Sequence, residues 1–164
     1  MPAIEDFIAL VREGGVRTLV DVRRQPFSRR HPQFSRDALA RSLADAGIAY
    51  AHEGDLGGHR EPRADSPNTA WRIDAFRGYA DHMATPAFQE ALARVAALER
   101  AAVMCAEANP ADCHRQLLSD ALVARGVTVR HLIAPGRAQE HALHPRAVRR
   151  GDVLVYPGAG QLSL

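Results

Sequence analysis

Residues 101–126, AAVMCAEANPADCHRQLLSDALVARG, predict a strand, a loop, a helix and a helix stop in direct succession. The run from 101 to 106 is almost entirely apolar, as in a strand buried on both faces of a parallel sheet. The helix is predicted from 113 to 125 and is stopped by Gly126, after which VTVRHLI predicts a fourth strand. A strand, a helix and another strand in this order indicate a parallel α/β sheet.

The same alternation extends toward both ends of the chain. The other predicted elements are helices over 4–13, 35–47 and 85–98 and strands over 16–23 and 48–52, with helical periodicity also through 71–79. We therefore expect a single α/β domain over residues 1–164, with a mainly parallel sheet, helices on both faces and a three-layer sandwich. Residues 135–164 are expected to form an irregular tail with one short strand at DVLVY, residues 152–156.

Composition excludes several classes of protein. Apolar residues make up 46% of the chain, which argues against disorder, and no run approaches the length of a membrane span. The N-terminus carries two acids and no basic segment, so we predict no secretory signal and a cytoplasmic location with reduced cysteines. All 21 basic Lys or Arg side chains are arginine, so the position of an arginine is more informative than its presence.

Three chemically rich loops follow predicted strands, after Val22, His52 and Cys105. The carboxyl ends of parallel strands lie at one edge of a sheet, where such folds bind their ligands. The sequence thus predicts a functional site at this edge.

The loop after Cys105 gathers a thiol, an acid, an imidazole and a guanidinium. Asp112 is a plausible N-cap, which would place Cys113, His114 and Arg115 in the first helical turn. A helix start lowers the pKa of a thiol and attracts anions, so Arg115 there suggests a bound phosphate or carboxylate. Alternatively, Arg115 only pairs with a nearby carboxylate, of Glu107, Asp112 or Asp21, and Cys105 is a small buried apolar side chain.

The same loop contains four side chains of the types that bind zinc. Cys105, Glu107, Cys113 and His114 are of ligand type, but an adjacent Cys and His rarely share one ion, and the chain has no CxxC pair. We therefore predict no metal site.

The loop after the first strand carries the largest local excess of positive charge, with arginines at 23, 24, 29, 30 and 36. Asp21 and Arg23 share a face of the strand, so Arg23 could clamp an anion while Asp21 orients it. Phe27 and Phe34 could stack on bases. The alternative is a solvated loop whose two aromatic side chains enter the core.

The loop after His52 contains Gly57 and Gly58, which allow a ligand to approach the backbone closely. His52, Glu53, Asp55 and His59 are acid–base candidates. His141 and His144 in the tail carry no functional signal.

Three stretches resemble, in order, the domain of unknown function 488 family: residues 21–60 with a D-V-R-x-x-P-x-S motif, 76–92, and 103–122 with C-x-E-x(5)-C-H-R. An L-G-G motif lies in the first of them. The resemblance implies a compact cytosolic α/β domain, without a known reaction or cofactor. The site positions that it implies are Asp21, Arg23, Pro26, Ser28, Leu56, Gly57, Gly58, Cys105, Glu107, Cys113, His114 and Arg115.

The chain departs from that family at its start, because members usually begin with a strand of the type Tyr-Thr-Ile-Gly-His-Ser. Either the true start lies upstream of Met1 or this member lacks the strand. A missing strand would expose a sheet edge, which a homodimer could cover.

A weaker likeness links residues 103–132 to rhodanese and Cys-phosphatase domains. The phosphatase loop needs Arg six residues after its nucleophilic Cys, but position 111 is Ala and position 119 is Ser. The sequence does not support a phosphate loop of that type.

Three hypotheses follow. The first is an enzyme for a phosphorylated or nucleotide-like anion. Its catalytic groups would be Cys105, Glu107, Cys113, His114 and Asp21, and Arg23, Ser28, Gly57, Gly58 and Arg115 would hold the substrate. The second is a non-catalytic nucleic-acid-binding module that uses the arginine loop, residues 23–36. The third is a purely structural network of Arg–carboxylate pairs, so whether the protein is an enzyme stays open.

Overall fold

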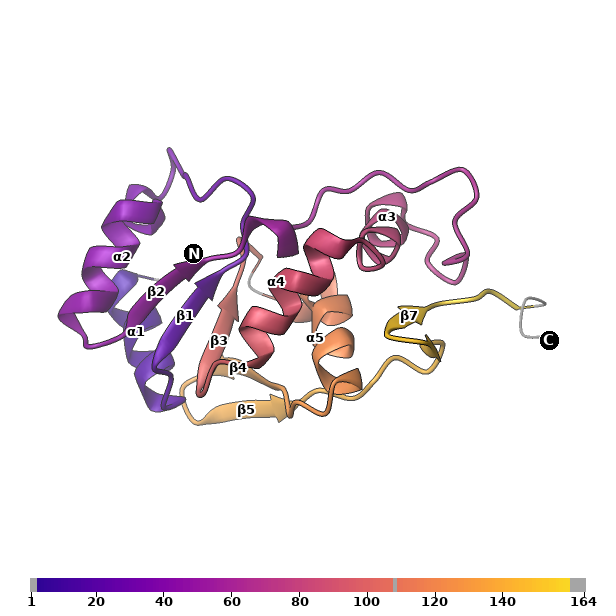
Figure 1. Cartoon of the computed structure of the whole chain (residues 1–164). Coiled ribbons are helices and arrows are strands. Elements are labelled where there is room, and N and C mark those ends of the chain that lie inside the picture. Colours follow the sequence, from indigo (N-terminus) through magenta and orange to yellow (C-terminus); the bar gives the residue numbers. More distant parts are fainter. Residues whose placement is uncertain (1–2, 108, 160–164) are drawn as a thin grey trace.

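Helices and strands alternate along most of the chain, as Figure 1 shows for the computed structural model, which describes residues 3–107 and 109–159. The helices are α1 (Ile4–Glu13), α2 (Arg36–Asp45), α3 (Asp74–His82), α4 (Pro86–Ala96) and α5 (Arg115–Ala124). The strands are β1 (Thr18–Asp21), β2 (Ala49–His52), β3 (Ala101–Met104), β4 (Arg130–Ala134), β5 (Arg137–Glu140), β6 (Val148–Arg150) and β7 (Val153–Val155). Mixed helices and strands confirm the α/β class.

The central sheet has three parallel strands in the order β2-β1-β3. Asp21 at the end of β1 pairs in register with His52 of β2 and Met104 of β3. All three strands therefore end level with one another. This register brings the loops after Val22, His52 and Cys105 to one edge, as predicted.

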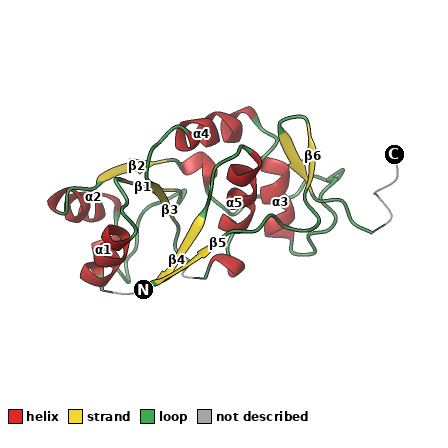
Figure 2. Cartoon of the chain, turned by 90° about the horizontal axis from the view of Figure 1, so that it is seen from below, coloured by secondary structure: helices red, strands yellow, loops and turns green. Residues whose placement is uncertain are grey.

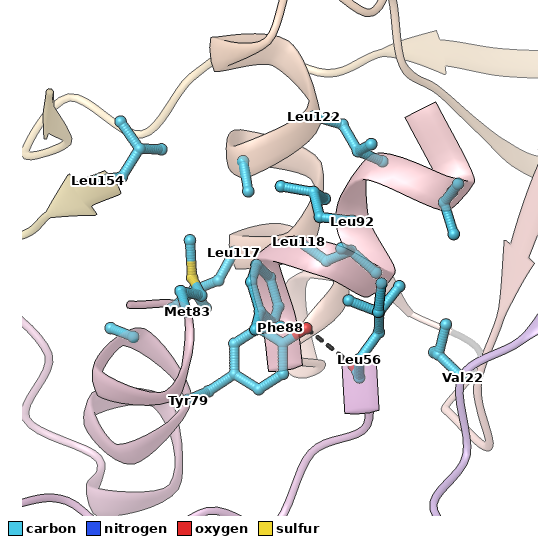
Figure 3. Close-up of a cluster of buried hydrophobic side chains, with 14 of the residues drawn as sticks. Val22, Leu56, Tyr79, Met83, Phe88, Leu92, Leu117, Leu118, Leu122 and Leu154 are labelled. Carbon is cyan, nitrogen blue, oxygen red and sulfur yellow. Dashed lines mark hydrogen bonds between the residues drawn. The ribbon is translucent and has the colours of Figure 1, made fainter. Parts of the chain in front are cut away.

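Successive side chains of β1 enter two separate hydrophobic clusters, as the pleat requires. Leu19 lies in a cluster with Phe34 and with side chains of α1 and α2. Val20 and Val22 lie in a larger cluster with α3, α4 and α5. Figure 3 shows the second cluster, in which the Tyr79 hydroxyl donates a 2.8 Å hydrogen bond to the carbonyl of Leu56. The core thus anchors the loop that contains the two glycines Gly57 and Gly58.

The strand predicted at 127–133 does not extend the parallel sheet. Residues Arg130–Ala134 pair antiparallel with β5, and β6 pairs antiparallel with β7 (Figure 2). Gly136, with φ +69°, lies in the turn between β4 and β5 and suits a reversal of the chain. Within the residues that the structure describes, the parallel sheet therefore has three strands, and the three-layer sandwich stays a prediction.

The tail has more strands than the sequence predicted. DVLVY does contain a strand, β7, but β5 and β6 were missed. The four residues of β5, RAQE, are all exposed and only the small Ala138 is apolar, so no alternation marks them as a strand. A local sequence pattern cannot predict a strand that forms only because it pairs with a neighbouring strand.

The tail returns to α5 through the buried carboxylate of Asp120. Its Oδ1 accepts hydrogen bonds from His141 Nε2 at 2.7 Å and from the His144 backbone at 3.1 Å, and its Oδ2 accepts one from the Tyr156 hydroxyl at 2.8 Å. His131 Nε2 lies 2.9 Å from His141 Nδ1. His141 and His144 therefore attach the tail to the domain.

A second buried carboxylate, Asp81 of α3, secures the long loop after the two glycines. It accepts hydrogen bonds from the Arg63 backbone, the Ser66 hydroxyl and the Asn68 side chain. Gly78 lets α3 approach this loop, because a Cβ there would lie 2.0 Å from the carbonyl oxygen of Arg60. The loop is thus fixed against the helices over much of its length.

No helix in residues 3–107 and 109–159 is long and apolar enough to cross a bilayer.

Candidate active site at the carboxyl edge of the sheet

The two cysteines of the chain meet at the carboxyl end of β3. Cys105 Sγ lies 2.9 Å from Cys113 Sγ, and both residues are free thiols buried in the larger hydrophobic cluster. Cys105 directly follows β3, whereas Cys113 lies two residues before the first residue of α5. Eight residues separate them in the sequence, and the strand–loop–helix turn brings them together.

The proton of this pair is held mainly by Cys105. The hydrogen bond to Cys113 and burial raise the pKa of Cys105. The hydrogen bond from Cys105 lowers the pKa of Cys113 and outweighs its burial, with further lowering from His114 and from the backbone N–H of Arg115. That N–H lies 3.4 Å from Cys113 Sγ, so the thiolate accepts one of the N–H groups left unpaired at a helix start. The lowered pKa makes Cys113 the more readily ionised sulfur of the pair.

The predicted N-cap at Asp112 is wrong. Asp112 lies in a short 3-10 helix, Pro110–Asp112, and its carboxylate accepts a hydrogen bond from Asn109. The α-helix begins at Arg115 with His114 as its N-cap. The Asn109–Asp112 bond closes a tight turn ahead of the helix. Cys113 therefore lies before the first helical residue, where it contacts Cys105.

His114 lies between the cysteine pair and the loop after β2. Its Nδ1 is 3.5 Å from Cys113 Sγ, and its ring centroid is 4.8 Å from that of Tyr79. A Cβ at Gly58 would lie only 2.7 Å from His114 Nδ1, so this position requires glycine for the ring to fit. Within the described residues, the buried Nε2 of His114 has no hydrogen-bond partner. A donor or acceptor is thus available beside the thiolate.

Asp21 and Arg23 form a buried pair at the end of β1. Arg23 donates from Nε and Nη2 to the two oxygens of Asp21, at 2.9 and 2.6 Å, and also to the carbonyl of Phe34. The Tyr50 hydroxyl donates to Asp21 Oδ2 at 2.7 Å. Burial lowers the pKa of Arg23, but the hydrogen bonds and charge of Asp21 raise it by more. The fork of Arg23 is thus directed at Asp21 in this structure.

Two other arginines, Arg24 and Arg60, hold the loop after β2. Arg60 donates to the carbonyls of Gly57 and Gly54, and Arg24 donates to that of His59. Burial, followed by the charge of Arg24, lowers the pKa of Arg60. A Cβ at Gly57 would lie 2.6 Å from Arg24 Cγ and 2.7 Å from the carbonyl oxygen of Val22. The charged side chains of Arg24 and Arg60 therefore lie close together beside Gly57. The residue after Gly57 is Gly58, which contacts His114.

Arg115 extends over the cysteine loop. Its Nη2 donates a short hydrogen bond to the backbone carbonyl of Glu107, and its charge lowers the pKa of Cys105. Glu107 also approaches Cys105, since its N–H lies 3.3 Å from that sulfur. The carbonyl and N–H of Glu107, rather than its carboxylate, make these contacts with the site.

Ser28 lies in a separate network within the arginine loop. Its hydroxyl accepts a hydrogen bond from the backbone of His31, and its N–H donates to Ser35 Oγ. The structure gives Ser28 a role in shaping its own loop. The other predicted site residues fall into three groups. The cysteine pair is approached by Glu107, His114, Arg115 and, through His114, Gly58. Asp21 pairs with Arg23, and Gly57 lies against Arg24 and Arg60.

Three residues with contacts in these groups were missed from sequence: Tyr50, Arg60 and Tyr79. Tyr50 sits on β2 and reaches Asp21 only because the two strands pair in parallel register. Tyr79 reaches His114 from α3, 35 positions away. Arg60 alone had a local signal, because it directly follows the glycine loop in the first of the three family-like stretches.

The described residues include no group of three or more His, Cys, Asp or Glu side chains that is arranged to hold a metal ion.

A pH titration of the thiols follows from these pKa directions. We expect the ultraviolet absorbance of one thiolate per chain to persist well below the ordinary cysteine pKa of about 8.5. Cys113→Ser should abolish this low-pH thiolate, and Cys105→Ala should raise the pKa of Cys113 because the donated hydrogen bond is lost. A parent chain whose thiolate absorbance appears only near pH 8.5 would contradict the assignment.

The same titration has a consequence for stability. The pKa of Cys113 is lower in the folded state than in the unfolded state. Its stabilising contribution is therefore fully present above about pH 8.5 and is lost as the pH falls through the folded-state pKa. The raised pKa of Cys105 acts in the opposite direction, and its contribution is lost as the pH rises above about 8.5. The two cysteines together therefore stabilise the folded state most at a pH near their unfolded-state pKa.

Comparison with known proteins identifies the family but adds no characterised relative. No curated protein and no solved structure matches the chain. The model of one family matches residues 3–122, which include all three strands of the parallel sheet, both cysteines, His114 and Arg115. The chain therefore belongs to the family described as domain of unknown function DUF488.

Proposed function

We propose that this protein is an enzyme in which the Cys113 thiolate attacks a small anionic substrate, phosphorylated or nucleotide-like, at the carboxyl edge of the sheet. The observation that carries the proposal is the 2.9 Å contact of Cys113 Sγ with Cys105 Sγ, beside His114. A thiol that is kept ionised by a hydrogen bond and a helix start is a nucleophile at neutral pH. A purely structural pair of cysteines would need neither the ionisation nor the neighbouring imidazole.

Three arginines that hold the loops of the candidate site support an anionic substrate. Arg24 and Arg60 lie close enough for the charge of Arg24 to lower the pKa of Arg60, and the nearby Asp55 carboxylate offsets this only in part, so a bound anion would be favourable there. Arg115 adds a third guanidinium on the side of the Cys105–Cys113 loop. We assign substrate binding to these three residues, and we assign to Arg23 the role of holding Asp21.

The acid–base role falls to His114. Its Nδ1 faces the Cys113 sulfur, and its buried Nε2 has no partner among the described residues. When the substrate's electrophilic centre forms a bond to Sγ, its bond to the leaving group breaks. The leaving atom then takes a proton from His114 Nε2. Cys105 keeps its proton and holds Cys113 ionised for the attack.

The first test is ligand binding by thermal shift, with inorganic phosphate, a nucleoside monophosphate, a sugar phosphate and a short single-stranded oligonucleotide as probes. A ligand at about 100 times its Kd stabilises the folded state by about 2.7 kcal/mol, which is a shift of a few degrees in Tm. We expect at least one phosphate compound to stabilise the parent and to lose this effect in Arg115→Ala. Turnover of that compound should then disappear in Cys113→Ser while its binding remains.

The matched control is Arg125→Ala at the opposite end of the same helix, where Arg125 is exposed and donates a hydrogen bond to Gln89. It removes the same charge away from the site and should leave the ligand-induced shift unchanged. Equal losses in Arg115→Ala and Arg125→Ala would mean that net charge, not a site, binds the anion. No shift with any small phosphate compound would overturn the anionic substrate.

A second candidate function, binding of single-stranded nucleic acid, is favoured by one specific observation. Phe27 is 68% exposed, and arginines 24, 29, 30 and 36 around it are exposed as well. An exposed aromatic side chain among cations is suited to stack on a base. The oligonucleotide in the same panel separates the two functions, because its binding should weaken steeply with salt and with Phe27→Ala, but not with Cys113→Ser.

A further inference from the structure

The contact between Cys105 and Cys113 has a chemical consequence that needs no anionic substrate. Their sulfur atoms lie 2.9 Å apart, about 0.9 Å more than an S–S bond of about 2.0 Å. The fold thus holds the two thiols already in contact, which is the arrangement from which a disulfide can form. Cys105 Sγ accepts the Glu107 N–H and Cys113 Sγ accepts the Arg115 N–H, so both sulfurs are held in place.

We propose that Cys105 and Cys113 are a redox-active pair that reduces small hydroperoxides, with Cys113 as the attacking sulfur and Cys105 as the resolving one. This activity goes beyond the proposed function, and it stands or falls independently of the anionic substrate. It differs from the chemistry of a lone cysteine, because the second sulfur is already in contact with the first.

The Cys113 thiolate attacks the terminal oxygen of the hydroperoxide, the O–O bond breaks, and Cys113 becomes a sulfenic acid. The alkoxide or hydroxide that leaves takes the proton of Cys105. The resulting Cys105 thiolate attacks the Cys113 sulfur, the S–O bond breaks, and the departing hydroxide is protonated by solvent to water. The two sulfurs lose two electrons and the peroxide gains them, and an external dithiol returns the pair to the reduced state.

Burial limits which oxidants can reach the pair. Cys113 is 2% exposed and Cys105 is 7% exposed, although the neighbouring Ala106, Glu107, Ala111 and Asp112 are exposed. A molecule the size of hydrogen peroxide needs only a small opening through this loop. We therefore expect hydrogen peroxide to react faster than the bulky cumene hydroperoxide.

The test uses the full chain, reduced and then treated with limiting hydrogen peroxide. Intact mass and counts of free thiols are followed over time, and peptide mapping locates the products. We expect both thiols to be lost together, with a mass decrease of two hydrogens, an intrachain link between Cys105 and Cys113, and full recovery after treatment with dithiothreitol. Repeated peroxide consumption should occur when dithiothreitol is supplied in excess, above its direct reaction with peroxide.

Two variants and one control separate the roles. Cys105→Ser should stop at a sulfenic acid on Cys113 that dimedone traps, with folding checked by circular dichroism. Cys113→Ser should lower the rate of peroxide reaction roughly tenfold or more, because it removes the sulfur whose pKa is lowered and leaves only the buried Cys105 thiol. The parent chain unfolded in denaturant needs no substitution. It should react more slowly than the folded parent, because the fold and not the composition activates Cys113.

Any of three results would overturn the proposal. One is oxidation of Cys113 beyond the sulfenic acid while Cys105 stays a free thiol. Another is a disulfide that links two chains rather than two residues of one chain. The third is a folded parent that reacts no faster than the unfolded one. Loss of peroxide reactivity with intact phosphate-compound turnover would reject this activity alone, and the reverse result would reject the proposed function alone.

Discussion

Replacing Asp21 with Asn is expected to lower the free energy of unfolding by about 3–5 kcal/mol, the range for removing one partner of a buried ion pair. Asp21 is fully buried and accepts both donors of the Arg23 fork as well as the Tyr50 hydroxyl. The amide keeps the shape but loses the charge, so Arg23, only 9% exposed, would be left without its counter-charge. Urea denaturation at neutral pH measures the loss as a shift in midpoint at constant m-value.

Two further variants show whether charge is the cause. Tyr50→Phe removes one hydrogen bond to the same carboxylate and should cost only about 1 kcal/mol. The double variant Asp21→Leu, Arg23→Met replaces the pair by apolar side chains and should be far more stable than the single Asn variant. If Asp21→Asn were no more costly than Tyr50→Phe, the pair would not be a buried ion pair in solution.

Asp120→Ala is the second substitution with a large expected effect, about 3 kcal/mol or more, because it removes the acceptor of three buried or partly buried donors at once. His141, His144 and Tyr156 would lose the bonds that tie the tail to α5. Proteolysis and hydrogen exchange should show the segment from β5 to β7 opening before the rest of the domain.

The matched control for this prediction is Tyr156→Phe, which removes one of the three bonds and should cost about 1 kcal/mol. Asp120→Ala and Tyr156→Phe should both leave peroxide oxidation of the cysteine pair intact where the domain remains folded. If Asp120→Ala destabilised β1–β3 and the tail to the same degree, the tail would be an inseparable part of one cooperative unit.

Much of the secondary structure could be predicted from local sequence. The helix over residues 4–13 matches α1, and Thr85 followed by Pro86 does begin α4, with the Thr85 hydroxyl accepting the N–H of Phe88. These features depend on periodicity and capping within a few residues. The predicted N-cap at Asp112 is wrong because its carboxylate accepts a hydrogen bond from Asn109 in a turn. This cause is also local, but it is harder to recognise in the sequence.

The candidate site was predictable in its location and less so in its contacts. The ends of β1, β2 and β3 meet at one edge, because parallel pairing brings carboxyl ends together whatever the side chains are. The sequence did not predict that the fork of Arg23 is directed at Asp21, nor that Tyr50 reaches the same carboxylate. These contacts depend on strand register and on burial, which no local pattern encodes.

By itself, the sequence determined the α/β class, the family, and the convergence of three chemically rich loops. The class and the convergence follow from short-range patterns of apolar residues, glycines and caps, and the family follows from its resemblance to three motifs in the same order. Only the tertiary structure decided that Cys105 and Cys113 lie in contact, that Gly58 makes room for His114, and that β4 turns back into a hairpin instead of joining the sheet. The physical reason is that these contacts join segments fixed by packing of whole helices on the sheet, so their distances emerge only when the core has formed.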